Sequence, residues 1–214
     1  MFAVGHFALG YLTGKPTSKG LKVKLNMPLL LLASIAPDTD LVLERFFPSV
    51  FQHRVEVHSL LFITAIMVPF FVIYRKKALP YYAALLSHVL IGDFFTGGVA
   101  LLWPFTTHFY GVYTINVNDP LSLSVELALF AISLPMMIYS KDLQALLKPH
   151  KLNLVLIVPG LAILVPLLQY GSKVSGEGSL PFLLIIPSLF WLIILVYSIL
   201  IELAAALRES PDNG

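Results

Sequence analysis

The chain has 214 residues, of which 57% are hydrophobic and only 12% are charged, and its mean hydropathy is +0.85. Soluble domains carry about 25% charged residues, so this composition excludes a soluble globular enzyme, and it is too poor in charge for a disordered chain. The absence of cysteine excludes disulfides, thiolate nucleophiles and thiolate metal sites. What remains is a polytopic membrane protein.

Seven apolar segments follow one another along the chain, at residues 1–14, 26–36, 59–74, 78–103, 121–139, 152–170 and 180–207. A full membrane span needs about 20 apolar residues, so the first two are expected to tilt or to form partial spans, and the last five are clearer. The sequence predicts an all-α fold, a polytopic membrane helical bundle of about five to seven transmembrane or partial-span helices.

The same pattern suggests a single membrane-embedded domain over residues 1–207, followed by a short tail at 208–214. Its first part, residues 1–105, holds most of the polar residues of interest, and residues 106–207 form a hydrophobic helical half. The net charge is only +2, and no basic run carries interleaved aromatic residues. We therefore expect membrane lipids and no nucleic acid as partners, and the sequence leaves the oligomeric state open.

The loops alternate in their content of lysine and arginine. Residues 15–24 hold four lysines, 75–77 hold three basic residues and 140–151 hold three lysines, whereas 104–120 hold none. Basic loops face the cytoplasm. The alternation predicts a multi-pass protein of the inner (plasma) membrane with its amino terminus outside and its carboxyl terminus in the cytoplasm.

On this topology, histidines and aspartates from five regions of the chain converge at one depth near the outer face. The convergent polar set is His6, Asp38, Asp40, His53, Arg54, His58, His88 and Asp93. Ionisable residues inside a span are costly and usually mark function, and a carboxylate in hydrocarbon needs a cation or several donors. Imidazole and carboxylate ligands suit Zn²⁺, Mn²⁺ or Fe²⁺, so we expect one or two divalent ions.

The spacing within this set constrains its geometry. His53 and His58 are five residues apart, as are His88 and Asp93, which on a regular α-helix corresponds to about 140° of rotation. Neither pair is then expected to chelate one ion from one helix face. His53 is expected in a loop with His58 in the first turn of the following helix, while His88 and Asp93 serve two ions, or one ion across a kink.

Asp38 and Asp40 follow Pro37, where the chain is expected to be extended, so that their side chains point to opposite sides. One carboxylate then ligates the metal while the other orients a histidine, or each serves one ion. A helix N-cap is the plain structural alternative, because Asp is a favoured capping residue.

Five motifs in this order resemble those of the LexA-regulated, metal-dependent hydrolases of the inner membrane. They are Gly5-His6 with Gly10, Pro37-Asp38-Thr39-Asp40, His53-Arg54 with His58-Ser59-Leu60, Ser87-His88 with Asp93, and Leu101-Leu102-Trp103-Pro104. The resemblance covers about the first 105 residues. It implies a membrane-bound hydrolase whose metal ligands are His6, Asp38, Asp40, His53, His58, His88 and Asp93.

The chain departs from the family pattern at three places. Leu41 stands where a histidine often follows the Pro-Asp-x-Asp run, Val55 replaces the usual glycine after His-Arg, and no basic residue follows Trp103-Pro104 closely. The first departure bears on the number of metal ions, and the last bears on how the substrate is bound.

Together these features predict a membrane-embedded metal-dependent hydrolase that acts on a lipid or lipid-linked (phospho)ester. The ion would most simply be zinc, with manganese or iron as alternatives. Asp40 or Glu56 would take the proton from water, and Arg54 would bind a phosphate as a fork. Two other functions fit the same residues, a metal or proton transporter and a non-catalytic membrane scaffold with a structural metal.

Overall fold

The structure, a computed structural model, describes residues 1–47, 49–112, 116–168 and 180–209. Within these ranges the chain is helical, and its only strand-like pairing is one isolated antiparallel bridge between Val99 and Tyr110. This confirms the all-α prediction.

The α-helices are α1 (Ala3–Gly20), α2 (Met27–Ile35), α3 (Asp40–Phe46), α4 (Leu60–Tyr74), α5 (Leu79–Ser87), α6 (Pro120–Tyr139), α7 (Asp142–Leu146), α8 (Ile157–Leu168) and α9 (Ile185–Glu209). Short segments of other helical types join them: η1 (Ala36–Thr39), η2 (Arg75–Lys77), η4 (Lys151–Leu156) and η5 (Phe182–Leu184) are 3₁₀-helices, and η3 (His88–Asp93) is a π-helix.

Three stretches in the described part of the chain are long and apolar enough to cross a membrane. They are Pro120–Tyr139, Lys151–Leu168 and Phe182–Arg208, and a shorter apolar helix runs over Met27–Thr39. Of the five clearer spans expected from sequence, the two at 59–74 and 78–103 form shorter helices. α4 has 15 residues, or about 22 Å at 1.5 Å per residue, which is the length of a partial span.

Two helix boundaries differ from those expected. α1 continues to Gly20 through a stretch expected to be a loop, and Lys15 within it forms an ion pair with Asp142 of α7. The helix expected over 78–103 stops at Asp93, and turns follow. Gly97 and Gly98 there adopt positive φ values of 133° and 83°, which glycine tolerates and an α-helix does not contain. Residues 169–179 and 210–214, which include the end of one expected span and most of the expected tail, lie outside the described residues.

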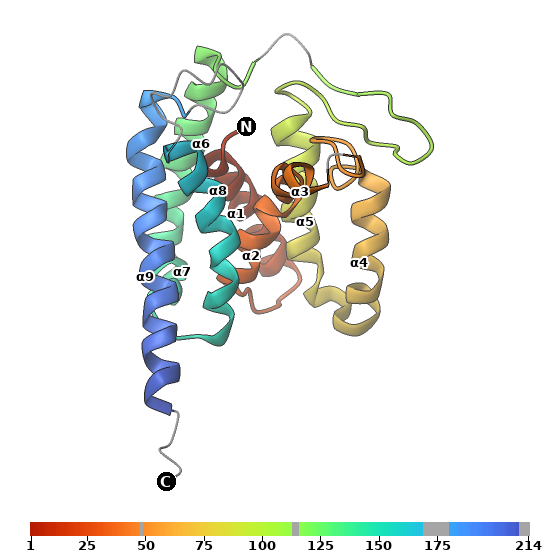
Figure 1. The fold of residues 1–214 in the computed structure, drawn as a ribbon. Coiled ribbons are helices and arrows are strands. Elements are labelled where there is room, and N and C mark those ends of the chain that lie inside the picture. The colour runs from red at the N-terminus through yellow and green to blue at the C-terminus, as the bar shows by residue number, and fades with distance from the viewer. Residues whose placement is uncertain (48, 113–115, 169–179, 210–214) are drawn as a thin grey trace.

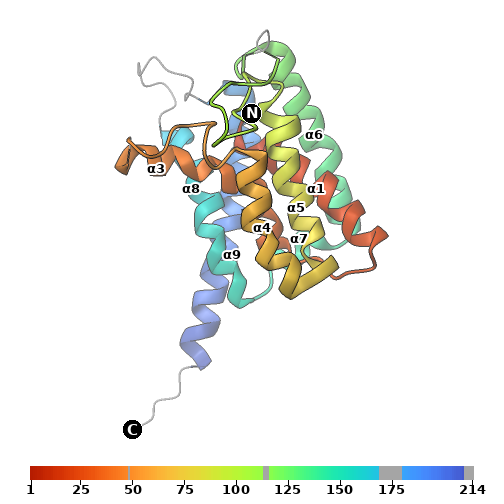
Figure 2. The same ribbon diagram turned by 90° about the vertical axis from the view of Figure 1, so that its right-hand side faces the viewer.

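The core forms where α1 packs against α2 and α5, with α8 and α9 alongside (Figures 1 and 2). Its largest fully buried side chains include Phe7, Tyr11 and Trp191. Small residues allow the close approach of α1, since a Cβ added at Gly10 would overlap Ser34 of α2. Gly10 therefore has the packing role expected of a small residue between membrane helices.

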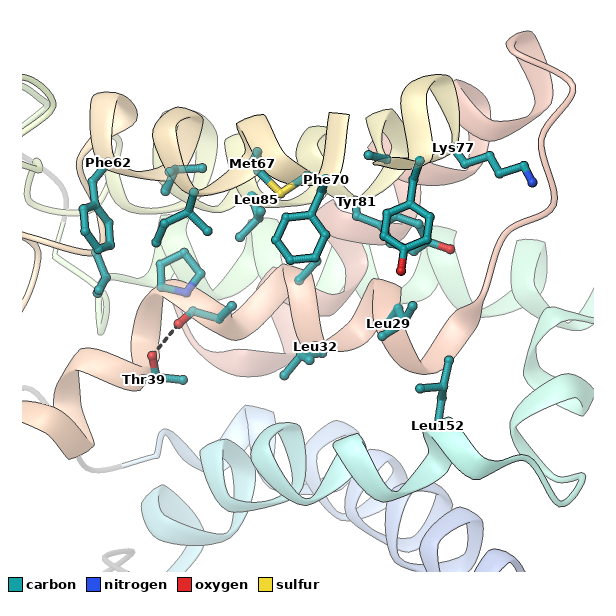
Figure 3. Close-up of a pocket in the computed structure, with 18 of the residues that line it drawn as sticks. Leu29, Leu32, Thr39, Phe62, Met67, Phe70, Lys77, Tyr81, Leu85 and Leu152 are labelled. Atoms are coloured by element: carbon teal, nitrogen blue, oxygen red, sulfur yellow. Dashed lines mark hydrogen bonds between the residues drawn. The ribbon is translucent and has the colours of Figure 1, made fainter. Parts of the chain in front are cut away.

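α4 stands apart from this core on the far side of α5 (Figures 1 and 2). Between α4 and α2 lies an apolar groove of about 780 Å³, drawn in Figure 3, with Leu152 of η4 at one end of its opposite wall. Lys24 and Lys77 also line it. The bundle thus has a packed side and a side with an open apolar groove.

We predict that the two ends of the bundle lie on opposite faces of the membrane. Reporter fusions at Lys76 in η2 and at Asp119, just before α6, should report the cytoplasm and the outside respectively, because basic loops remain in the cytoplasm. The reverse pattern at both positions would overturn this orientation and move the histidine and aspartate cluster to the cytoplasmic side.

Candidate metal centre

Five ligand-type side chains converge from four parts of the chain. His6 comes from α1, Asp38 from η1, and His88 and Asp93 from η3, while His58 lies in the loop before α4. All five side chains are nearly or fully buried, and Asp38 is the most accessible, with 14% of its side chain exposed. The convergence expected from the topology is therefore present in the fold.

The π-helix explains how His88 and Asp93 meet. In a π-helix the backbone N–H bonds to the carbonyl five residues earlier, so residues five apart lie about one turn from each other. Phe94 N donates to Val89 O at 3.1 Å in this register. The expectation that the pair could not share one face was wrong, because it assumed α-helical geometry.

Two further local expectations need correction. The segment holding Asp38 is a 3₁₀-helix and not extended, although with three residues per turn Asp38 and Asp40 still point in different directions. His58 lies outside α4, since Ser59 is the N-cap of that helix and accepts a hydrogen bond from Phe62 N. Neither aspartate caps a helix through its side chain, so capping is not their role.

The outer nitrogens of two histidines are held by acceptors, which leaves their Nε2 atoms facing the cluster. His88 Nδ1 donates to the Ser34 carbonyl at 2.7 Å. His58 Nδ1 lies 2.8 Å from Asp40 Oδ2, an ion-pair contact in which the N–H is not well aligned with the oxygen. Such partners fix the tautomer and the orientation of metal-bound histidines in known sites.

Four ligand atoms lie close together at the centre of the cluster. His58 Nε2 lies 3.3 Å from His88 Nε2, 2.9 Å from Asp93 Oδ2 and 3.5 Å from Asp38 Oδ1. His88 Nε2 is 3.3 Å from each of the same two carboxylate oxygens. A tetrahedral zinc ion with bonds of about 2.0–2.1 Å separates its ligand atoms by about 3.3 Å. These five separations are close to that value, so the four atoms can share one small cation.

These contacts are hard to satisfy without a cation. In neutral histidines whose Nδ1 carries the proton, each Nε2 offers a lone pair, and both lone pairs would face each other and two carboxylates. If both rings were protonated instead, two positive N–H groups would lie 3.3 Å apart. With only one ring protonated, its Nε2–H can donate to the other Nε2 or to one carboxylate, but not to all three acceptors in line. Asp93 Oδ2 also has no hydrogen-bond partner among the described residues. A bound divalent ion resolves all of these contacts at once.

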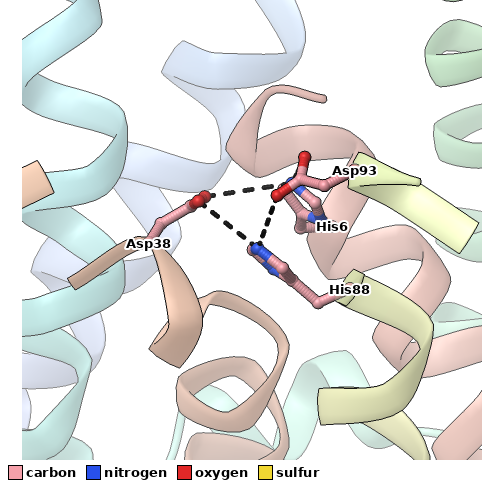
Figure 4. A group of neighbouring side chains, drawn as sticks. All are labelled: His6, Asp38, His88 and Asp93. Carbon is pink, nitrogen blue, oxygen red and sulfur yellow. Dashed lines mark ion pairs between the residues drawn. The ribbon is translucent and has the colours of Figure 1, made fainter. Parts of the chain in front are cut away.

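His6 extends the cluster on its other side. Its ring stacks on His88 at a centroid distance of 3.6 Å, and its Nε2 lies 3.9 Å from Asp38 Oδ2 and 3.7 Å from Asp93 Oδ1 (Figure 4). Neither ring nitrogen has a hydrogen-bond partner in the described part of the protein. His6 therefore faces the second oxygen of both carboxylates, where it can complete the first site or hold a second ion.

Asp40 connects the buried cluster to the loop. Its Oδ1 accepts a hydrogen bond from His53 Nδ1 at 2.9 Å, and its Oδ2 accepts one from the backbone of Arg54 at 3.0 Å. Burial alone would raise the pKa of Asp40, but contacts with His53 and His58 outweigh it and hold that pKa below its ordinary value. Asp40 is thus an ionised carboxylate positioned to orient two histidines.

The carboxylates of the cluster favour the protonated, positively charged form of His58 when no metal ion is bound. Burial alone would lower the pKa of His58, but contacts with three carboxylates outweigh it and raise that pKa well above its ordinary value. Two groups of four residues have ligand atoms that all lie within 4.8 Å of one another. One group is His6, Asp38, His88 and Asp93, and the other is Asp38, Asp40, His53 and His58. Asp38 belongs to both, so the fold can hold one or two metal ions.

The two other residues expected at the site differ in their placement. Arg54 adopts a positive φ of 66°, and its guanidinium lies 3.7 Å from Asp93 Oδ1 and donates to the Thr96 carbonyl. Its Nε has no hydrogen-bond partner among the described residues. Glu56 instead accepts a hydrogen bond from Gln52 N within the loop, and no described contact joins Glu56 to the cluster.

Sequence reasoning missed several residues that shape this site. A Cβ added at Gly92 would overlap the ring of His6, and one added at Gly97 would overlap the guanidinium of Arg54. The Ser34 carbonyl, which orients His88, is also absent from the motifs. Gly92 beside Asp93 was a usable signal, but a backbone carbonyl leaves no trace in residue types.

Fold and site together define an all-helical membrane protein with a buried cluster of histidines and aspartates suited to a divalent metal ion. The sequence matches the YdjM inner membrane protein family over residues 1–173, and the chain belongs to that family. The match confirms the resemblance and extends it well beyond residue 105. Neither a curated protein nor a solved structure matches the chain significantly.

We predict that Asp40→Asn weakens metal binding by about 10- to 100-fold, the usual effect of losing a carboxylate that orients a histidine ligand. Metal titration of the purified, chelator-treated protein measures this affinity. Asp119→Asn, a matched change outside the cluster, should leave affinity unchanged. Equal affinity in the parent and Asp40→Asn would contradict the orienting role.

Proposed function

We propose that this protein is a membrane-embedded metal-dependent hydrolase that acts on a lipid or lipid-linked phosphoester. The observation that carries the proposal is the close group formed by His58, His88, Asp38 and Asp93, whose ligand atoms are spaced like the ligands of one small cation. When bound, a divalent ion such as zinc lowers the pKa of a coordinated water and polarises the electrophilic centre of the substrate.

Access to the cluster favours a catalytic over a structural site. The side chains with the most exposure around it are His53 at 27%, Asp38 at 14% and Arg54 at 12%, whereas His58 and His88 are fully enclosed. One side of the cluster therefore opens toward the loop that carries His53 and Arg54. A catalytic site must admit water and substrate, and on this proposal the water would be a fifth ligand of an ion held by four side chains.

Arg54 is positioned to bind an anionic substrate. Its guanidinium lies beside Asp93 with 12% of the side chain exposed, and its buried Nε lacks a partner among the described residues. Arginine recognises phosphate with two parallel hydrogen bonds. This favours a phosphoester over an uncharged ester, and the membrane setting favours a lipid carrier for it.

His53 is the group best placed to move a proton. Because Asp40 is ionised and can only accept, His53 Nδ1 donates to it, and the ring Nε2 is left free as a base at the exposed side. A histidine oriented by a carboxylate in this way is a common general base. Asp40 has both oxygens engaged, so on this proposal it orients His53 and does not itself take the proton.

Two histidine variants separate these roles. His58→Ala should lose bound metal, because a ligand is removed. His53→Gln should keep the metal content of the parent and lose hydrolysis by about 10²- to 10⁴-fold, the usual contribution of a general base. Elemental analysis and a phospholipid hydrolysis assay on the same preparations measure both effects. A halved metal content in His53→Gln would instead make His53 a ligand of a second ion.

Asp93→Asn distinguishes a catalytic metal from a structural one. Asparagine keeps the shape but binds a cation less well, and its neutral amide is cheaper to bury than a carboxylate. A catalytic metal predicts a folded, inactive variant whose thermal stability in detergent equals or exceeds that of the metal-free parent. If the variant is destabilised and the parent hydrolyses no phospholipid class, the enzyme proposal is wrong. That result would favour a non-catalytic membrane scaffold with a structural metal.

For the substrate contact, we predict that Arg54→Gln lowers kcat/KM for phosphoester lipids by about 10- to 100-fold, the cost of a lost hydrogen bond to a charged group. Metal content should not change, because Arg54 donates hydrogen bonds and cannot ligate a cation. A variant with parental kcat/KM would remove Arg54 from substrate binding.

A further inference from the structure

Beside the metal centre, the apolar groove between α4 and α2 begins close to the ligands. Pro37 and Thr39, which flank Asp38, line it, as does Val57, which precedes His58 (Figure 3). The sequence neighbours of the two ligands Asp38 and His58 therefore form one end of the groove. From there the groove follows α4 past Met67 and Phe70 to Tyr74.

The wall of the groove is suited to hydrocarbon. Along its length it is built mostly from aliphatic and aromatic side chains, and the charged residues that line it are Lys24 and Lys77. Lys77 lies near Tyr81, at the end away from Thr39 (Figure 3). Nothing in the middle of the wall offers a charge to a polar ligand. Its volume of about 780 Å³ falls in the range of small-molecule sites.

The length of the groove also matches one chain of a membrane lipid. From Phe62 to Tyr74 along α4 the distance is about 18 Å at 1.5 Å per residue. The hydrocarbon core of a bilayer is about 30 Å thick, so a single leaflet is about 15 Å deep. One extended acyl chain therefore fits between the site end and the lysine end.

We propose that this groove binds an acyl chain of a glycerophospholipid and so places the phosphoester group of that lipid at the metal centre. This inference rests on the proposed function and names its substrate class. The outward side chains of α4, among them Val72 and Ile73, are 72% and 69% exposed and would face the bilayer, whereas Met67 on the groove side is 6% exposed. A lipid can therefore enter sideways between α4 and the core.

Photocrosslinking tests this inference independently of activity. The full chain is reconstituted in vesicles of phosphatidylethanolamine that contain the same lipid with a diazirine midway along one acyl chain, and the adducts are mapped by mass spectrometry. We expect adducts on the groove-side residues Met67 and Leu85, as well as on the outward residues Val72 and Ile73, which contact bulk lipid.

Leu32→Trp, which fills the groove from α2, should remove most of the groove-side adducts and leave those on Val72 and Ile73 in place. Ala131→Trp on the exposed face of α6 is the matched control and should change neither set. The metal content of Leu32→Trp should equal that of the parent, which shows that the site still folds.

Groove-side adducts that persist in Leu32→Trp, or that never form, would overturn the acyl-chain inference. Hydrolysis by a parent without groove-side adducts would contradict this inference alone. Groove-side adducts on a parent that binds no metal and hydrolyses no phospholipid would instead contradict the proposed function and leave lipid binding in place.

Discussion

Two imidazole nitrogens that face each other at 3.3 Å, between two buried carboxylates, are the constraint on which the rest of this structure depends. Two neutral rings that donate through Nδ1 would bring two lone pairs together, so a positive charge is needed between the rings, either a proton on one of them or a metal ion. A divalent ion serves both rings and both carboxylates, because metal–ligand bonds replace the repulsion between lone pairs and the lost hydration of the carboxylates. The surrounding fold then serves to hold five side chains in these positions inside an apolar bundle.

Several unusual local features make sense as means to that end. The π-helix brings His88 and Asp93 onto one face, the glycine at 92 admits the ring of His6, and the Ser34 carbonyl fixes the tautomer of His88. π-Segments are often found at functional sites, and here the segment has an identifiable purpose. Asp40 also helps to position the site, because it contacts both the buried His58 and the more exposed His53.

Membership of the YdjM inner membrane protein family places this arrangement in a membrane, and three long apolar helices agree with that setting. Composition alone sufficed to predict an all-helical membrane protein, because hydrophobic segments of this length have few other uses. The convergence of His6, Asp38, His58, His88 and Asp93 was also predictable, since alternating basic loops place their segments at one end. The local geometry of the site was not predictable. Two residues five apart point in different directions on an α-helix and lie on one face of a π-helix, and the sequence does not distinguish the two helix types. The apolar groove beside α4 was equally invisible, because its wall residues look like any membrane helix.

The central claim is that His58, His88, Asp38 and Asp93 surround one ion, and zinc K-edge X-ray absorption of the zinc-loaded protein tests it most directly. The account predicts a first shell of about four nitrogen and oxygen atoms at about 2.0–2.1 Å, with the outer-shell scattering of at least two imidazole rings. His88→Ala should lose imidazole scattering or lose the zinc altogether. A parent spectrum of a six-coordinate ion bound only by oxygen, without imidazole scattering, would contradict the account.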